Sequence, residues 1–158
     1  MARTLRRLRA GGFTLLEMLI TVTVLMILAS AVVPMAKNAV QRQKEIELHR
    51  ALRELRNAID EYKSAVDQQK IKPPPLEAMG YPPTLDELVE GVQMTGRLTG
   101  RMRFLRRIPV DPMTGRAEWG VRSVNDEHKS TTWGGGSVFD VYSQARGSGM
   151  NGQAYRDW

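Results

Sequence analysis

The sequence has no cysteine, few aromatic residues and only two histidines. Without cysteine, disulfides, cysteine-ligated metals and thiol nucleophiles are excluded. Histidine is the side chain suited to acid–base work near neutral pH, and here only His49 and His128 could do it. No serine–histidine–aspartate arrangement and no phosphate-binding glycine loop is recognisable. These absences argue against an enzyme.

Charge is almost absent from residues 13–36, where Glu17 is the one ionisable side chain. A helix of that length spans about 36 Å at about 1.5 Å per residue, enough to cross a bilayer core of about 30 Å. All the charges before it are basic, at Arg3, Arg6, Arg7 and Arg9. By the positive-inside rule this end stays in the cytoplasm, and the rest of the chain faces outward.

The net charge of +6 is mostly a property of those four arginines, and the remainder of the chain carries only +2. Five arginines lie within residues 96–107, but Phe104 is the only aromatic residue among them. Nucleic-acid binding usually combines a basic face with interleaved aromatic residues. We therefore interpret these arginines as solvated loop charges or inter-subunit salt bridges, with no nucleic-acid partner.

Glu17 is the residue that an ordinary membrane anchor does not explain. A carboxylate at the centre of a spanning helix costs about 2.5–3.5 kcal/mol, and less near the interface. One interpretation is an interfacial glutamate of little consequence. The other is that Glu17 finds a cationic partner when the helix packs against copies of itself, because a buried charge is tolerable when it is paired.

The run GGFTLLE at residues 11–17 resembles the processing site of type IV pilins and pseudopilins. The resemblance implies that the leader, residues 1–12, is cut after Gly12 and that Phe13 becomes the N-methylated first residue. It implies that Glu17 neutralises the new amine of a neighbouring subunit. Pro34 also matches a proline of the family, and the helix is expected to kink there and to unwind partly in a fibre.

Residues 37–70 contain no glycine or proline, and from Leu48 onward their apolar side chains recur every three or four positions. This spacing predicts an amphipathic helix continuous with the apolar segment, from Phe13 to about Lys70. The apolar positions are Val40 and Ile46, followed by the predicted stripe of Leu48, Ala51, Leu52, Leu55, Ala58, Ile59, Tyr62, Ala65 and Val66. Three prolines at 73–75 are expected to terminate the helix.

Residues 71–158 predict a small globular domain, so the fold class is α+β with a long N-terminal helix. Thr84 and Glu87 have capping-box spacing before a short helix that Gly91 should stop. Residues 108–115 form a double-proline turn. Residues 119–123 and 138–143 predict two strands of a hairpin with a long connection. We expect Trp158 to pack on this sheet.

The C-terminal half, RRIPVDPMTG, EWGVRS, VFDVYS and NGQAYRDW, is similar to G-type major pseudopilins of type II secretion. That resemblance implies a single-pass inner-membrane protein with a periplasmic domain. Its partners would be copies of itself, prepilin peptidase, minor pseudopilins and the inner-membrane assembly platform. The alternatives are a type IV pilus subunit for adhesion, motility or DNA uptake, and a membrane-tethered binding module that never polymerises.

Many G-type pseudopilins bind calcium in the loop after the last strand. Calcium takes six to eight oxygen ligands, usually including carboxylates. The corresponding residues 144–152 contain no acidic side chain, although Asp140 and Asp157 flank them. Residues 126–128, Asp-Glu-His, are a second candidate cation site. The interpretation is that no cofactor is bound, with calcium as the open alternative.

Overall fold

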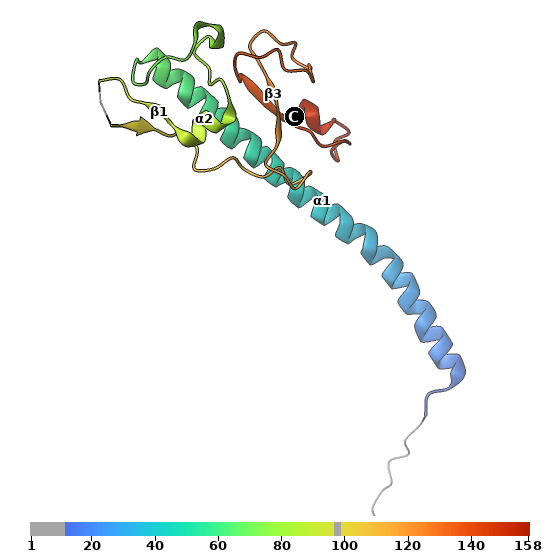
Figure 1. The fold of residues 1–158 in the computed structure, drawn as a ribbon. Helices are drawn as coiled ribbons and strands as arrows, with labels where there is room; N and C mark the ends of the chain where they lie inside the picture. Colours follow the sequence, from blue (N-terminus) through green and yellow to red (C-terminus); the bar gives the residue numbers. More distant parts are fainter. Residues whose placement is uncertain (1–11, 97–98) are drawn as a thin grey trace, which may run out of the picture. The chain divides into compact units, whose positions relative to one another are not determined.

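The computed structural model describes residues 12–96 and 99–158, without the side chains of 31–34. Its main element is helix α1, Leu15–Asp67, 53 residues long (Figure 1). The predicted continuous helix is therefore confirmed, and it runs through position 34 without a break in its assignment. The chain divides after Val40 into two compact units, so α1 contributes to both.

Helix α1 ends before the three prolines, not at them. Gln69 adopts a left-handed φ of 55°, and the amide of Lys70 donates to the carbonyl of Ala65. The chain then turns back, and Ile71 pairs with Met94 in an isolated bridge. The helix end is thus made by a local backbone turn, while the prolines shape the extended segment that follows.

The short helix α2 spans Leu85–Glu90, as the capping pattern predicts. Thr84 occupies the N-cap position with an extended backbone, but its side chain makes no capping hydrogen bond. The capping-box prediction is therefore right about the position of Thr84 and wrong about its hydrogen bond. Gly91 ends the helix with a φ of 81°. A Cβ at Gly91 would lie 2.6 Å from the carbonyl oxygen of Met102, so only glycine fits this close approach.

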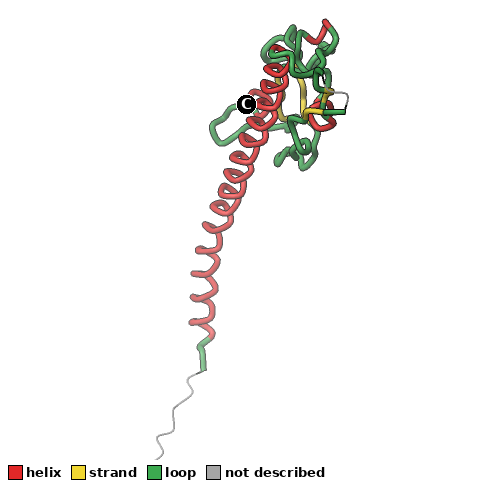
Figure 2. The backbone as a smooth tube through the Cα atoms, turned by 90° about the vertical axis from the view of Figure 1, so that its left-hand side faces the viewer, coloured by secondary structure: helices red, strands yellow, loops and turns green. Residues whose placement is uncertain are grey.

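The predicted hairpin is confirmed. Strand β3, Trp119–Arg122, pairs antiparallel with β4, Asp140–Ser143, and Arg122 lies opposite Asp140. A second, smaller pair joins β1, Val92–Gln93, to β2, Arg101–Met102. The arginine-rich part of this region was predicted to be a loop, because two-residue strands contain too few positions to show alternation. Loops make up much of this unit (Figure 2).

The core of the second unit forms around the apolar stripe of α1. Eight of the predicted stripe positions are buried: Leu48, Ala51, Leu52, Leu55, Ala58, Ile59, Tyr62 and Ala65. They pack against residues from the rest of the unit, including Ile71, Leu88, Trp119, Val138, Val141 and Tyr155. Val40 and Ile46, which precede the predicted stripe, are 59% and 48% exposed. The covered stripe therefore starts at Leu48.

Trp158 packs on α1 as well as against the core cluster. Its ring stacks on His49 of α1 with the ring centroids 4.2 Å apart and the planes 10° from parallel. Tyr155 meets the same ring edge-on at 5.1 Å. The 3-10 turn Tyr155–Asp157 also contacts strand β4, so the C-terminus joins α1 to the β3–β4 hairpin.

Candidate functional site

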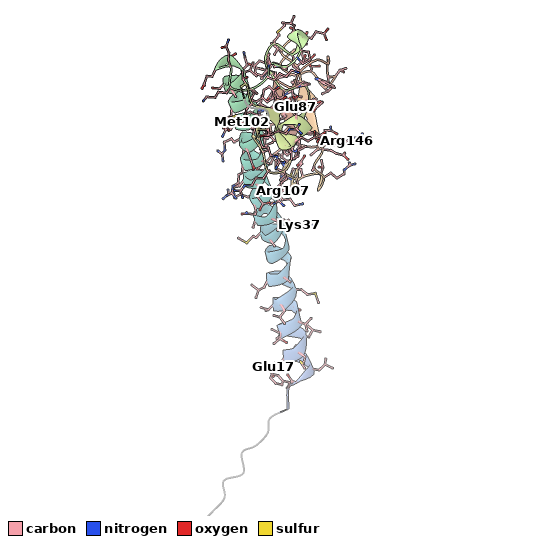
Figure 3. All side chains as sticks on the ribbon, turned by 60° about the vertical axis from the view of Figure 1, so that its left-hand side comes forward. Glu17, Lys37, Glu87, Met102, Arg107 and Arg146 are labelled. Atoms are coloured by element: carbon pink, nitrogen blue, oxygen red, sulfur yellow. The ribbon has the colours of Figure 1, made fainter. Side chains whose placement is uncertain are left out.

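The first turn of α1 is built by Thr14, and it places Glu17 at a defined position. The amide of Glu17 donates to the Thr14 hydroxyl oxygen at 3.1 Å, and the amide of Met18 donates to the Thr14 carbonyl at 3.1 Å. Thr14 is therefore the N-cap and Glu17 the third helical residue. Figure 3 shows Glu17 at the N-terminal end of α1. A carboxylate in the first turn also favours the positive end of the helix dipole.

The N-cap role of Thr14 was not predicted, although the sequence contains its signal. Thr14-Leu15-Leu16-Glu17 has the Ser/Thr-x-x-Glu spacing of a capping box directly before an apolar run. The structure forms the threonine half of the box. Within the described chain the Glu17 carboxylate accepts no hydrogen bond and forms no ion pair, so it remains available to another group.

The predicted cleavage bond lies outside the helix. Gly12, Phe13 and Thr14 have no helical or strand structure, Phe13 is 73% exposed, and a Cβ at Gly12 would meet nothing within 4 Å. The predicted leader falls largely on residues 1–11, which are not described. If the bond between Gly12 and Phe13 is cut, the Thr14 cap stays with the mature chain, and the new amine precedes it by one residue.

The apolar side chains that follow are uncovered. Every described residue from Phe13 to Ser30 is exposed, with values such as 84% for Leu15 and 62% for Leu25. By length and composition alone, α1 is the one described helix capable of crossing a membrane. Monomeric soluble proteins rarely expose a continuous apolar surface of this extent, so this segment is built to contact lipid or protein.

The few hydroxyl groups in this apolar segment are satisfied within the helix. Thr21, Thr23 and Ser30 donate to the carbonyls of Met18, Leu19 and Ile27, respectively, at 2.7–2.9 Å. In hydrocarbon an unsatisfied polar group would cost several kcal/mol. These internal bonds leave the Glu17 side chain as the polar group of residues 13–30 that needs a partner from outside.

A polar cluster holds the second unit together. Asp140 accepts from Arg56 Nε at 2.7 Å and from Arg122 Nη1 at 3.2 Å, joining α1 to the β3–β4 hairpin. The two guanidinium groups also donate to main-chain oxygens of four residues: Ser130, Val141, Arg156 and Trp158. Arg122 is 5% exposed and lies 4.2 Å from the centre of the Tyr142 ring. The guanidinium groups of Arg56 and Arg122 thus occupy the space that is lined by the Asp140 carboxylate and these main-chain oxygens.

The candidate cation site at residues 126–128 is not formed. The Asp126 carboxylate accepts from the amides of Ser123 and Gly134, and these backbone bonds lower the pKa of Asp126. Glu127 and His128 are exposed. The described residues contain no group of three or more His, Asp or Glu side chains arranged to hold a metal. Asp126 instead holds the two ends of the β3–β4 connection together by accepting hydrogen bonds from both.

Residues 144–152, the other candidate cation site, are held to α1 by a hydrogen bond. The amide of Met150 donates to Glu45 Oε1 at 3.0 Å, and Ser148 bridges to Ala154. Glu45 also accepts from the hydroxyl of Tyr155. One hollow of about 590 Å³ lies beside this loop, lined in part by Arg146 and Arg156. Its lining includes no acidic side chain and no histidine.

Comparison with protein families identifies residues 7–33 as a prokaryotic N-terminal methylation motif. This match supports a place in the type IV pilin-like superfamily, whose members are structural subunits, and the α+β architecture is consistent with that fold. The motif implies processing by a prepilin peptidase and pilus-like polymerisation. Neither the curated proteins nor the solved structures give a significant match to the chain.

Proposed function

We propose that this protein is a major pseudopilin, the repeating subunit of a type II secretion pseudopilus that drives protein export across the outer membrane. In this proposal residues 1–12 are the leader and 13–36 anchor the subunit and later form the fibre core. Residues 37–70 continue the helix, and 71–158 form the periplasmic domain. The observation that carries it is the uncovered apolar helix, with Glu17 as its one charge, preceding a folded domain.

Glu17 would pair with the Phe13 amine of a neighbouring subunit. Two charges that are each costly in an apolar fibre core become tolerable as a pair, and removing one leaves the other uncompensated. The subunit would first reside in the inner membrane through the same helix, with its N-terminal arginines in the cytoplasm. Pro34 would allow the helix to loosen as it leaves the membrane for the fibre.

The first experiment expresses the full chain with and without a prepilin peptidase and determines the mature N-terminus by mass spectrometry. We expect loss of residues 1–12 and one added methyl group on Phe13, only when the peptidase is present. Gly12→Val should keep the leader, because a bulky residue replaces the glycine before the cut. Recovery of uncut chain in the presence of active peptidase, with no polymer, would overturn the proposal.

The second experiment tests Glu17 directly. Glu17→Ala should insert into the membrane and lose its leader normally, but it should form far fewer fibres than wild type. Met18→Ala is the matched comparison, because it removes apolar surface from the same segment without changing charge, and it should lower the fibre yield less than Glu17→Ala does. Fibres are counted after sedimentation and by microscopy. Normal fibre formation by Glu17→Ala would show that the ion pair is dispensable.

A type IV pilus subunit is the second candidate within the same superfamily. The absence of cysteine argues against pilins with a C-terminal disulfide loop, and the similarity of the C-terminal half favours the secretion branch. Genomic neighbours separate the two, because secretin and secretion ATPase genes accompany a pseudopilus and retraction genes accompany many pili. Deleting the gene should abolish export of a secreted protein and leave surface adhesion unchanged.

A further inference from the structure

The solvent side of α1 in the second unit carries an ordered distribution of charge. Exposed positions at spacings of three and four, with Glu61 directly after Asp60, form one continuous face: Arg42, Ile46, Arg50, Arg53, Asn57, Asp60 and Glu61. We call this face the charge stripe. It lies opposite the buried stripe that starts at Leu48, and its basic residues all precede its acidic ones. The face is therefore positive toward the membrane segment and negative farther along the helix.

The charges of this stripe have no partner within the described chain. Arg42, Arg50, Arg53, Asp60 and Glu61 appear in no side-chain hydrogen bond and no ion pair among the described residues. By contrast, Lys63 and Asp67 at the end of the same helix pair with each other at 2.6 Å. Ile46, in the middle of the basic part, leaves 48% of its surface exposed. Such a face is well suited to a partner of matching charge order.

We infer that the charge stripe binds the charge stripe of a second copy of this chain, parallel to it and displaced along the helix axis. This inference rests on the proposed function, in which every subunit enters the fibre in the same orientation. Without displacement, arginines would face arginines and carboxylates would face carboxylates, which is unfavourable. A shift that brings Arg53 level with the second copy's Asp60 covers seven residues, or about 10 Å at about 1.5 Å per residue.

The displacement has the same direction as the one required by the proposed pair at the N-terminus. Phe13 precedes Glu17 by four residues, or about 6 Å along a helix, and Arg53 likewise precedes Asp60. In both places the cation comes first in the sequence, so one axial shift satisfies both. The two displacements differ by less than the pitch of about 5.4 Å, which flexible arginine side chains can bridge.

One exposed ion pair contributes only about 0–1 kcal/mol, so the stripe must act through its several charges and through repetition along the fibre. Its effect should also weaken with salt, because the screening length is about 8 Å at 0.15 M ionic strength and about 3 Å at 1 M. We therefore assign the stripe to setting the axial displacement, while apolar burial by residues 13–36 supplies cohesion.

Charge reversal tests the stripe in the full, processed chain. Arg50→Glu with Arg53→Glu makes the stripe acidic apart from Arg42, and Asp60→Arg with Glu61→Arg makes it wholly basic. Each variant alone should form at least about tenfold fewer sedimentable fibres, and mixing the two should restore assembly, because unlike stripes then meet. Lys70→Glu with Lys72→Glu is the control for the acidic variant, with the same charge change on exposed residues outside the stripe.

The absence of native cysteine permits a second test of geometry. One chain carrying Arg53→Cys and another carrying Asp60→Cys are expressed together and cross-linked with a short thiol reagent. Heterodimers are expected between these two chains, and not when Lys70→Cys replaces Asp60→Cys. Fibres from the charge-reversed variants at wild-type yield, without the cross-link, would overturn the inference and leave the proposed function standing. Unprocessed wild-type chain without fibres would instead refute the proposed function.

Discussion

Helix α1 presents two regions with opposite dependence on their surroundings. From Phe13 to Ser30 every described side chain is exposed, and the polar groups other than Glu17 are satisfied inside the helix. From Leu48 onward one face is buried by the chain's own core, and the other carries unpaired charges. The comparison indicates that the second unit can be stable within one molecule, whereas the first needs lipid or other subunits.

The largest effect is expected from breaking the polar cluster of the second unit. Asp140→Ala leaves the guanidinium groups of Arg56 and Arg122 without their shared carboxylate, and Arg122 is almost fully buried. Removing one partner of a buried pair typically costs about 3–5 kcal/mol, so the unfolding midpoint in denaturant should fall markedly. Leader cleavage should be unchanged, because the N-terminal segment makes none of these contacts. An unaltered midpoint would contradict the assigned role.

The next prediction compares leucines from the two regions. Leu55 is fully buried and Leu19 is 60% exposed, although both lie on α1. Leu55→Ala should lower the free energy of unfolding of the C-terminal domain by about 2–5 kcal/mol. Leu19→Ala should leave that free energy unchanged and lower fibre yield instead. Denaturant titrations in detergent measure the free energy of unfolding, and sedimentation measures the fibre yield. If both variants changed the same one of these two quantities, the distinction between the regions would be wrong.

A smaller effect is expected at the two threonine N-caps. Thr14 accepts a hydrogen bond from the amide of Glu17, whereas the side chain of Thr84 makes no capping bond. Thr14→Ala should therefore cost about 0.5–2 kcal/mol of local helix stability, seen as faster hydrogen exchange at the Glu17 amide. Thr84→Ala should change exchange in α2 much less. Equal changes at the two helices would mean that the Thr14 bond is not a stabilising cap.

The smallest effect concerns pH and Glu87. Burial raises the pKa of Glu87, with Glu90 adding to the rise, and Tyr62 and Arg101 acting in the opposite direction. A raised pKa in the folded state means that the neutral acid is favoured, so its contribution is complete at low pH and is lost as pH rises through that pKa. Glu87→Gln should thus stabilise the domain at pH 7 and have little effect at pH 3. Denaturant midpoints at both pH values provide the measurement.

Features set by local order were predictable. The continuous helix follows from the spacing of apolar residues over 13–70, the end of α2 from Gly91, and the β3–β4 hairpin from alternation in two short runs. Even the Thr14 cap could have been read from its spacing to Glu17. An error occurred at Thr84, where the capping spacing is present but the side chain makes no capping hydrogen bond. The buried stripe begins at Leu48 as predicted, and Val40 and Ile46, which precede it, are exposed.

By itself, the sequence determined an apolar helix with one carboxylate in its first turn and a charge order along its outer face. These follow from residue type and from about 3.6 residues per helical turn, which no other segment needs to supply. Only the tertiary structure decided that Arg56, Arg122 and Asp140 meet, that Asp126 is held by backbone amides, and that Trp158 stacks on His49. Those contacts depend on how distant segments pack around the core, and the spacing of residues along the chain does not determine this packing.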